Sequence, residues 1–533
     1  MPHDEAGAEP QDVVAELAKI AATRDWAALE ALCDRLWLAL PGHYGAEFLA
    51  AFDQVPEEEL LQRPRLLVGW LLASYVTQDP HPRELRPLLR QYIDFGPRLA
   101  TMVDPETETS AATLTVAGTL IMISTRLRGD LEDAERLGRQ LTARMAQLDA
   151  RPSTEGPVRP GWIAMQRGLT LSLLGDLPGA VEQYREAHEL ARTEPVANYA
   201  GVNAAANLAM IFAQLGHLET SQQWLSTLDS YPPPPPNVAH LLTVGGTIAR
   251  GWHALDQYDW PGLDAALETV GDGTQPIELW PFGTALVGTR ALHAGRAVEY
   301  LDTLHVVQLS HPATVTAQGT GLRALQRARA DLLIAAGEAN RALRLINDAG
   351  TGAHWLAVPA ARLRLLNGDY ELARALASRG PWHPVASHRD TRQLLLIKAS
   401  AALRMGERDE AVKAMSAAMR LRSPDEVLSL TTVPTPEREE LFALTTVPLS
   451  DTAAERLAAA RPVFPEHIRL IDLTAREQAV LAELTTGATA VQIARTLVVS
   501  VNTVRTQIQS IYRKLDVSTR DTALMRASEL GIL

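Results

Sequence analysis

The chain has 533 residues, of which 46% are hydrophobic, 21% charged and 5% aromatic. This length is too great for one hydrophobic core, so it excludes a single domain and predicts about three or four domain-sized units. Alanine, leucine and arginine dominate the runs between glycines and prolines, which favours helix over strand. We therefore predict a globular, all-α protein.

The N-terminal residues 1–12 are acidic and contain no apolar stretch, so we interpret them as a disordered segment and not as a signal peptide. The uncharged run from Thr109 to Thr125 is rich in Thr and Ser and short for a membrane span. We expect a cytoplasmic protein with no membrane contact. The single cysteine, Cys33, lies in an apolar helical run, which favours a core position over redox sensing.

Residues 13–422 contain a recurrent pattern, in which an apolar helical run, a Gly-polar break and a second helical run follow one another. Successive breaks are 31 to 41 residues apart in the best copies, which is typical of an array of helical hairpins. Glycine ends the first helix of each pair because it adopts the left-handed conformation at low cost. The breaks lie at Gly129, Gly175, Gly216, Gly337, Gly368 and Gly406.

These pairs resemble tetratricopeptide repeats, with matches at Leu174, Gly175, Ala180 and Tyr184 in the best copy. The first hundred residues also resemble the helical sensor region of large MalT-like regulators. The resemblance implies a helical solenoid whose groove binds a peptide, a partner protein or a small effector. A generic helical bundle is the alternative.

Residues 423–465 contain many prolines, which prevent a continuous helix. We interpret them as a linker with one short helix, 451–461, between this helical region and a C-terminal domain, 466–533.

The C-terminal domain contains helix-start signals that predict four helices, near 475–486, 490–497, 501–515 and 520–529. Thr474 with Glu477 and Thr489 with Gln492 have the spacing of capping boxes, and Ser500 is suited to cap the third helix. Only three residues separate the second and third helices, which is the turn of a helix-turn-helix.

The third helix has two distinct faces when its residues are placed at 100° intervals. Its apolar residues form one stripe, and a polar stripe without acids lies opposite. A helix that enters the major groove of DNA needs donors for base edges and phosphates and excludes carboxylates. The apolar stripe comprises Val504, Ile508, Ile511 and Leu515, and the polar stripe comprises Asn502, Arg505, Thr506, Gln509 and Arg513.

The segment resembles the LuxR-type (NarL/FixJ-like) helix-turn-helix. The matching residues include Leu473-Thr474, Arg476-Glu477, Gly487, Ile493-Ala494, Thr503-Val504-Arg505, Lys514-Leu515 and Arg520. The resemblance implies that Arg505, Thr506 and Gln509 face the bases of double-stranded DNA. It also implies a homodimer whose contact involves the last helix, at Ala523, Leu524, Ala527 and Leu530. By their position, the residues expected to contact the DNA backbone are Ser500, Asn502, Thr503, Arg513, Lys514 and Arg520.

The sequence contains neither the GxxxxGK[ST] motif of the ATPase module in MalT-like regulators nor a grouping with metal-ligand spacing. We therefore expect no enzyme and no cofactor. The function predicted is that of a sequence-specific transcriptional regulator whose helical region senses a signal. The alternatives are a repeat-based interaction scaffold in which DNA binding is secondary, and an enzyme-like sensor that consumes its ligand.

Formal charge is unevenly distributed along the chain. The net charge is −13, yet residues 466–533 carry +1 and the preceding residues −14. This division suggests a further hypothesis, in which the acidic part folds back over Arg505 and Arg513 and excludes DNA.

Overall fold

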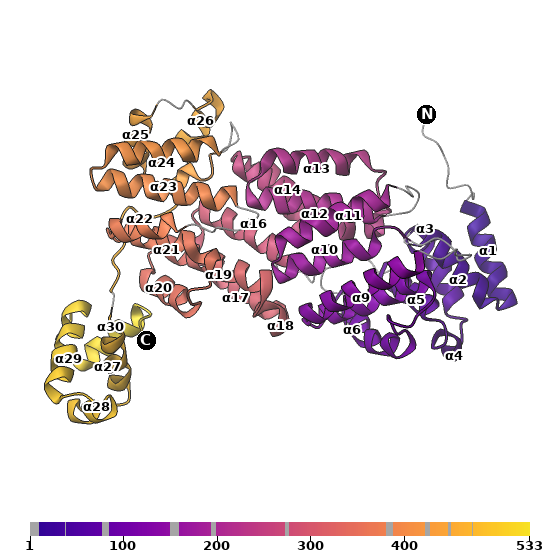
Figure 1. The fold of residues 1–533 in the computed structure, drawn as a ribbon, viewed down its shortest axis with the longest axis horizontal. Helices are drawn as coiled ribbons and strands as arrows, with labels where there is room; N and C mark the ends of the chain where they lie inside the picture. The colour runs from indigo at the N-terminus through magenta and orange to yellow at the C-terminus, as the bar shows by residue number, and fades with distance from the viewer. Residues whose placement is uncertain are drawn as a thin grey trace. The chain divides into compact units, whose positions relative to one another are not determined.

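The computed structural model describes residues 10–37, 39–76, 85–149, 159–192, 199–271, 277–379, 387–421, 427–445, 449–471 and 473–533. The described residues contain helices and no strands, as the composition predicts. The predicted N-terminal segment 1–12 lies mostly outside them, and the first helix already begins at Pro10. Figure 1 shows the helices in chain order.

The helices of the first part of the chain are α1 (Pro10–Thr23), α2 (Trp26–Leu36), α3 (Ala39–Phe52), α4 (Glu57–Leu60), α5 (Pro64–Val76), α6 (Leu85–Met102), α7 (Ala111–Thr113), the π-helix η1 (Leu114–Gly118), α8 (Thr119–Leu127), α9 (Leu131–Asp149), α10 (Trp162–Leu174), α11 (Leu177–Ala191), α12 (Ala200–Leu215), α13 (Leu218–Ser230), α14 (Pro236–Asp256) and α15 (Trp260–Val270).

The later helices are α16 (Trp280–His293), α17 (Ala297–Ser310), α18 (Ala313–Thr316), α19 (Gly319–Ala335), α20 (Ala339–Asp348), the short η2 (His354–Leu356), α21 (Ala357–Leu366), α22 (Tyr370–Ser378), α23 (His388–Arg404), α24 (Arg408–Arg420), the short η3 (Leu430–Thr432), α25 (Thr435–Leu444), α26 (Asp451–Ala459), α27 (Ala475–Thr485), α28 (Ala490–Thr496), α29 (Val501–Leu515) and α30 (Arg520–Glu529).

The chain divides into two compact units. The first comprises Met1–Val287, His305–Leu325 and His383–Ser387, and the second comprises Gly288–Leu304, Gln326–Trp382 and His388–Leu533. We refer to α1–α26 as the body and to residues 473–533 as the C-terminal domain.

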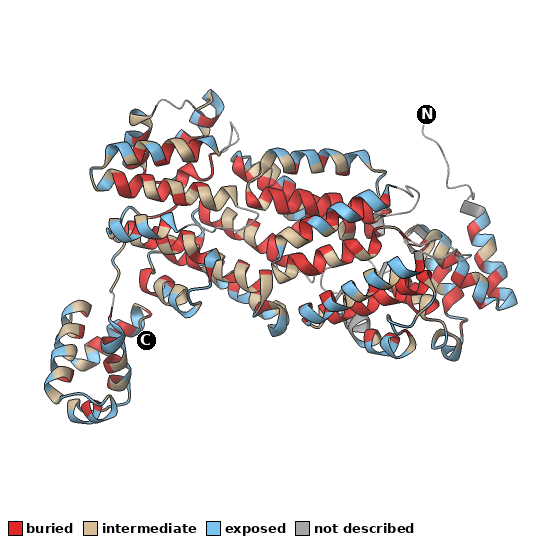
Figure 2. Ribbon diagram, in the orientation of Figure 1, coloured by how far each residue is buried: buried red, intermediate tan, exposed pale blue. Residues whose placement is uncertain are grey.

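The first unit contains helical hairpins that pack in sequence. Helix α12 lies against α11, α13 and α14, and nearly all of its residues are buried (Figure 2). Gly175 shows why the hairpins turn where they do. It closes α10 at a φ of 85°, and Asp176 then caps α11 by accepting a hydrogen bond from the Gly179 amide at 3.1 Å. All six break glycines predicted from the sequence have a positive φ.

The second unit continues the same pattern, with α21 to α25 packed in sequence. The prediction of a linker with one short helix over 423–465 is wrong in part, because α25 and the short η3 form there as well as α26. Helix α25 packs against α23 and α24, its Leu441 is fully buried, and Pro436 lies in its first turn, where a missing amide is harmless.

Candidate nucleic-acid interface

The C-terminal domain has a hydrophobic core of its own, to which all four helices contribute. The caps expected from the sequence are present. Thr474 and Glu477 form a capping box at α27, Thr489 and Gln492 form another at α28, and the Ser500 hydroxyl accepts the Thr503 amide at 3.0 Å to begin α29. The core comprises Leu473, Val480, Leu481, Leu484, Ile493, Ala494, Val504, Ile511, Leu515, Ala523 and Ala527.

Helix α29 has the two faces predicted from its periodicity. Val504, Ile511 and Leu515 are buried in the core, and Ile508 packs against it. All five residues of the polar stripe are exposed, and this set, Asn502, Arg505, Thr506, Gln509 and Arg513, is called the reading face below. Because α28 and the short turn precede it, the domain presents a polar helix in the manner of a helix-turn-helix.

Positive charge in the C-terminal domain is available to a ligand at four arginines. Arg476, Arg495, Arg505 and Arg513 are exposed, and none forms an ion pair with a described residue. The fold-back hypothesis, with carboxylates of the acidic part over Arg505 and Arg513, stays a prediction. Unpaired guanidinium groups on one small domain are suited to phosphates and guanine edges.

Glu477 connects the start of α27 to the middle of α29. Its carboxylate accepts hydrogen bonds from the Lys514 ammonium at 2.6 Å, the Ser510 hydroxyl at 2.7 Å and the Thr474 amide at 2.7 Å. Burial acts to raise the pKa of this carboxyl, but the hydrogen bonds from Lys514, Ser510 and Thr474 outweigh burial and lower the pKa to about 2. Glu477 is therefore ionised and holds α29 in place.

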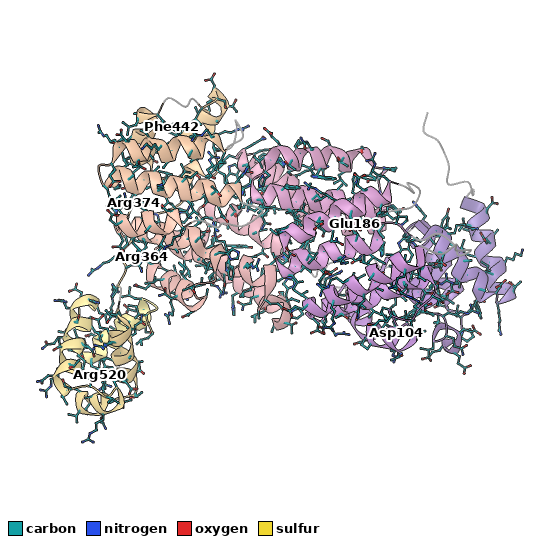
Figure 3. The ribbon with its side chains drawn as sticks, in the orientation of Figure 1. Asp104, Glu186, Arg364, Arg374, Phe442 and Arg520 are labelled. Carbon is teal, nitrogen blue, oxygen red and sulfur yellow. The ribbon has the colours of Figure 1, made fainter. Side chains whose placement is uncertain are left out.

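Two residues expected to contact the DNA backbone form hydrogen bonds within the C-terminal domain. The Lys514 ammonium is paired with Glu477 and partly buried. The Arg520 guanidinium donates to the carbonyls of Leu484, Gly487 and Ala488, at and just after the end of α27. Figure 3 labels Arg520 on the C-terminal domain. These bonds give Lys514 and Arg520 a role in the fold of the domain, and their contact with the DNA backbone stays a prediction.

The smaller polar residues at the start of α29 retain part of their hydrogen-bonding capacity. The Ser500 and Thr503 hydroxyls lie 2.7 Å apart and bond to each other. Thr506 donates its hydroxyl hydrogen to the Asn502 carbonyl at 3.0 Å, which leaves its methyl group and oxygen lone pairs facing outward. Thr506 is therefore suited to a thymine methyl and not to donating to a base.

The residues expected at a dimer contact fall into two groups. Ala523 and Ala527 are fully buried in the core of the domain, so they are not available to a second chain. Leu524 and Leu530 are partly buried against the same core. On α30 the most exposed apolar side chain is that of Met525, which was not among the residues predicted from the sequence.

A connecting segment, residues 461–471, lies between the body and the C-terminal domain and contacts the body at several points. Phe464 is buried under the Arg362 guanidinium, with 4.3 Å from Cζ to the ring centroid. The amide of Leu470 donates to Asn367 Oδ1 at 2.8 Å, and that of Ile471 to Asn340 Oδ1 at 2.9 Å. Sequence reasoning missed these contacts, because their partners lie about a hundred residues earlier.

These features define a helix-turn-helix domain with an exposed, acid-free recognition helix, which is the architecture of a DNA-binding domain. Residues 472–527 match the family model of bacterial regulatory proteins of the luxR family. This match supports a DNA-binding transcriptional regulator. It covers only the C-terminal part of the chain, and a search of curated proteins found no match.

Neither a membrane span nor a metal-binding group is found among the described residues. No helix among them is both long and apolar enough to cross a membrane. No group of three or more His, Cys, Asp or Glu side chains in the same ranges is arranged to hold a metal ion. Cys33 is buried in the core of the first helices, as predicted, and burial with nearby Asp34 and Glu30 raises the pKa of its thiol.

Proposed function

We propose that the protein is a sequence-specific transcriptional regulator that places α29 in the major groove of double-stranded DNA. Arg505 would bind a guanine through its forked guanidinium, Gln509 an adenine edge, and Thr506 a thymine methyl. Asn502 and Arg513 would contact phosphates on either side. The observation that carries this proposal is the exposed reading face, polar and without a carboxylate, on a domain whose core is complete.

We further propose that the body is the regulatory part and that it recognises a peptide, a partner protein or a small effector. Successive helical hairpins with capped turns support this proposal, because stacked hairpins present extended surfaces suited to such ligands. A homodimer belongs to the same proposal. One reading helix spans only a few base pairs, and two copies on adjacent half-sites provide the affinity that one lacks. We assign no catalytic role.

The proposal is tested by selecting ligands for the full-length protein from a pool of random double-stranded DNA. We expect enrichment of one motif, repeated at a spacing of about one helical turn. The selected site is then used in electrophoretic shift assays with wild-type protein and two variants, Arg505→Ala on the reading face and Arg136→Ala on α9. Arg136 lies in the body and pairs with Asp133, so this control removes the same charge elsewhere.

The outcome separates the regulator from the interaction scaffold. A regulator enriches a motif and loses its preference only in the Arg505→Ala variant. A scaffold enriches no motif, and its residual DNA binding changes equally in both variants because it depends on charge alone.

A further inference from the structure

The outer face of α17 carries a group of exposed apolar side chains. Val298, Val306 and Leu309 are 65%, 52% and 72% exposed. Elsewhere in the described body, large exposed hydrophobic residues occur singly, at Val14, Leu61, Leu190 and Leu372. Isolated exposed leucines and valines are ordinary, but three on one helix indicate a contact surface.

These residues form a continuous stripe on one helix. At 100° per residue, Val298, Asp302, His305 and Leu309 fall within about 60° of one another. Leu301 and Val306 flank them, and Asp302 and His305 are exposed like the apolar members. The opposite face, with Tyr300, Leu304 and Val307, is buried. The α17 stripe comprises Val298, Leu301, Asp302, His305, Val306 and Leu309.

The α17 stripe is complementary to itself when a second copy of the helix runs antiparallel to it. A two-fold axis near the middle of the helix opposes residues 298 and 309 and residues 302 and 305 near the centre of the contact, and it leaves Leu301 and Val306 at the two edges. Val298 then faces Leu309, and the Asp302 carboxylate faces a His305 imidazole that can donate to it. Such matching is what a two-fold symmetric contact between identical chains requires.

A parallel arrangement lacks this complementarity, because it opposes Asp302 to Asp302 and His305 to His305. An unrelated partner has no reason to match the order of residues from both ends of the stripe. We therefore propose that α17 pairs antiparallel with α17 of a second copy of this chain, and that this pairing is a dimer contact of the body.

The size of the stripe sets the strength of the dimer. The helix is about 21 Å long, at about 1.5 Å per residue, so the pair buries less than the roughly 1,000 Å² of a stable interface. The dimer is consequently weak and depends on protein concentration. On DNA, the two C-terminal domains add a second link between the same chains, and the effective concentration of one body near the other rises.

The test is sedimentation velocity of the full-length protein over a concentration series, without DNA. Wild-type protein is expected to shift from monomer to dimer as concentration rises. Leu309→Arg places a charge in the apolar contact and should abolish the shift. Leu372→Arg, at an exposed leucine on α22, is the matched control and should dimerise like the wild type.

A charge exchange identifies the pairing. Asp302→Arg opposes a cation to His305, and His305→Glu opposes two carboxylates, so each single variant should weaken dimerisation by about tenfold. The double variant Asp302→Arg/His305→Glu restores an attractive pair and should recover the wild-type dissociation constant. Both positions are exposed, so neither change disturbs the fold of the body.

A wild-type protein that stays monomeric at every concentration would overturn the proposal. So would dimerisation of Leu309→Arg at the wild-type level, or a double variant no better than the single ones. None of these outcomes affects the proposed DNA reading, which the selection experiment tests on its own. Conversely, a protein that dimerises but selects no DNA motif would support the α17 contact and contradict the proposed function as a transcriptional regulator.

Discussion

Glu477 fixes the position of the reading helix through contacts that cross the C-terminal domain. The carboxylate caps its own helix through Thr474 and holds Ser510 and Lys514 of α29. Because this carboxylate accepts three hydrogen bonds and is almost fully buried, removing its charge weakens the bond from Lys514.

We predict that Glu477→Gln destabilises the C-terminal domain by about 2 to 3 kcal/mol at pH 7, slightly less than the roughly 3.4 kcal/mol that corresponds to a pKa lowered from 4.5 to about 2. The folded pKa of about 2 lies below the unfolded value, so this stability is present above about pH 4.5 and is lost as the pH falls toward 2. The loss of stability is measured by hydrogen exchange of the α27 and α29 amides in the full-length protein. Glu529→Gln, at an exposed pair, is the control. Unchanged protection in Glu477→Gln would contradict the role assigned to this carboxylate.

Val498 combines an exposed apolar side chain with a left-handed backbone conformation. It is 88% exposed and has a φ of 53° in the turn between α28 and α29. This conformation costs a residue with a Cβ about 1 to 2 kcal/mol, and a β-branched side chain fits it poorly.

We expect Val498→Asn to stabilise the helix-turn-helix by about 1 kcal/mol, because asparagine tolerates the left-handed region. Slower hydrogen exchange of the α28 amides would show this gain. Val499→Asn changes the neighbouring valine, whose φ is not positive, and should give no gain. Equal behaviour of the two variants would mean that Val498 is not strained.

At the scale of elements, the sequence predicted α29 and α30 with the bounds that the structure has, and α27 and α28 to within one residue. These ends depend on local signals, namely the hydroxyl caps of Thr474, Thr489 and Ser500 and the left-handed Gly487. The role of Lys514 was not predictable in the same way. Its partner lies 37 residues away, and spacing along a helix contains no information about a contact between helices.

The contacts of the connecting segment, like the partner of Lys514, could not be predicted from local sequence. Its prolines indicated a break in helix, yet its position depends on distant residues of the body, namely Asn340 in α20, Arg362 in α21 and Asn367 at the end of α21. A chain whose amides are bonded to asparagine side chains of the body is an ordered element, although it has no regular secondary structure.

We predict that Asn340→Ala combined with Asn367→Ala accelerates hydrogen exchange of the Leu470 and Ile471 amides by tenfold or more, because each loses a hydrogen bond worth about 1 kcal/mol and a fixed partner. Protection in α27–α30 should change much less, since Ile471 packs against the core of that domain but the buried members of the core all lie beyond the segment. Asn347→Ala, at an exposed position on α20, provides the control. Wild-type exchange in the double variant would mean that other contacts hold the segment.

At the scale of the whole molecule, the charge division and the structure together assign DNA contact to a small part of the chain. The body carries most of the acidic excess and is repelled by phosphate, whereas the reading face is cationic and has no acid. A resemblance over about sixty residues predicted the DNA-binding domain. The irregular repeats predicted only that the body is helical. The α17 stripe follows from exposure in the folded body, which no local pattern reveals.

The central claim is that α29 reads base sequence through Arg505 and Gln509. It is tested most directly by binding isotherms of full-length wild type, Arg505→Ala and Gln509→Ala, each on the selected site and on sites with one base pair changed. We predict that each variant loses about 1 to 3 kcal/mol and becomes indifferent to the one base pair that its missing side chain reads. If Arg505→Ala retains both the affinity and the base preference of the wild type, the reading face is assigned incorrectly.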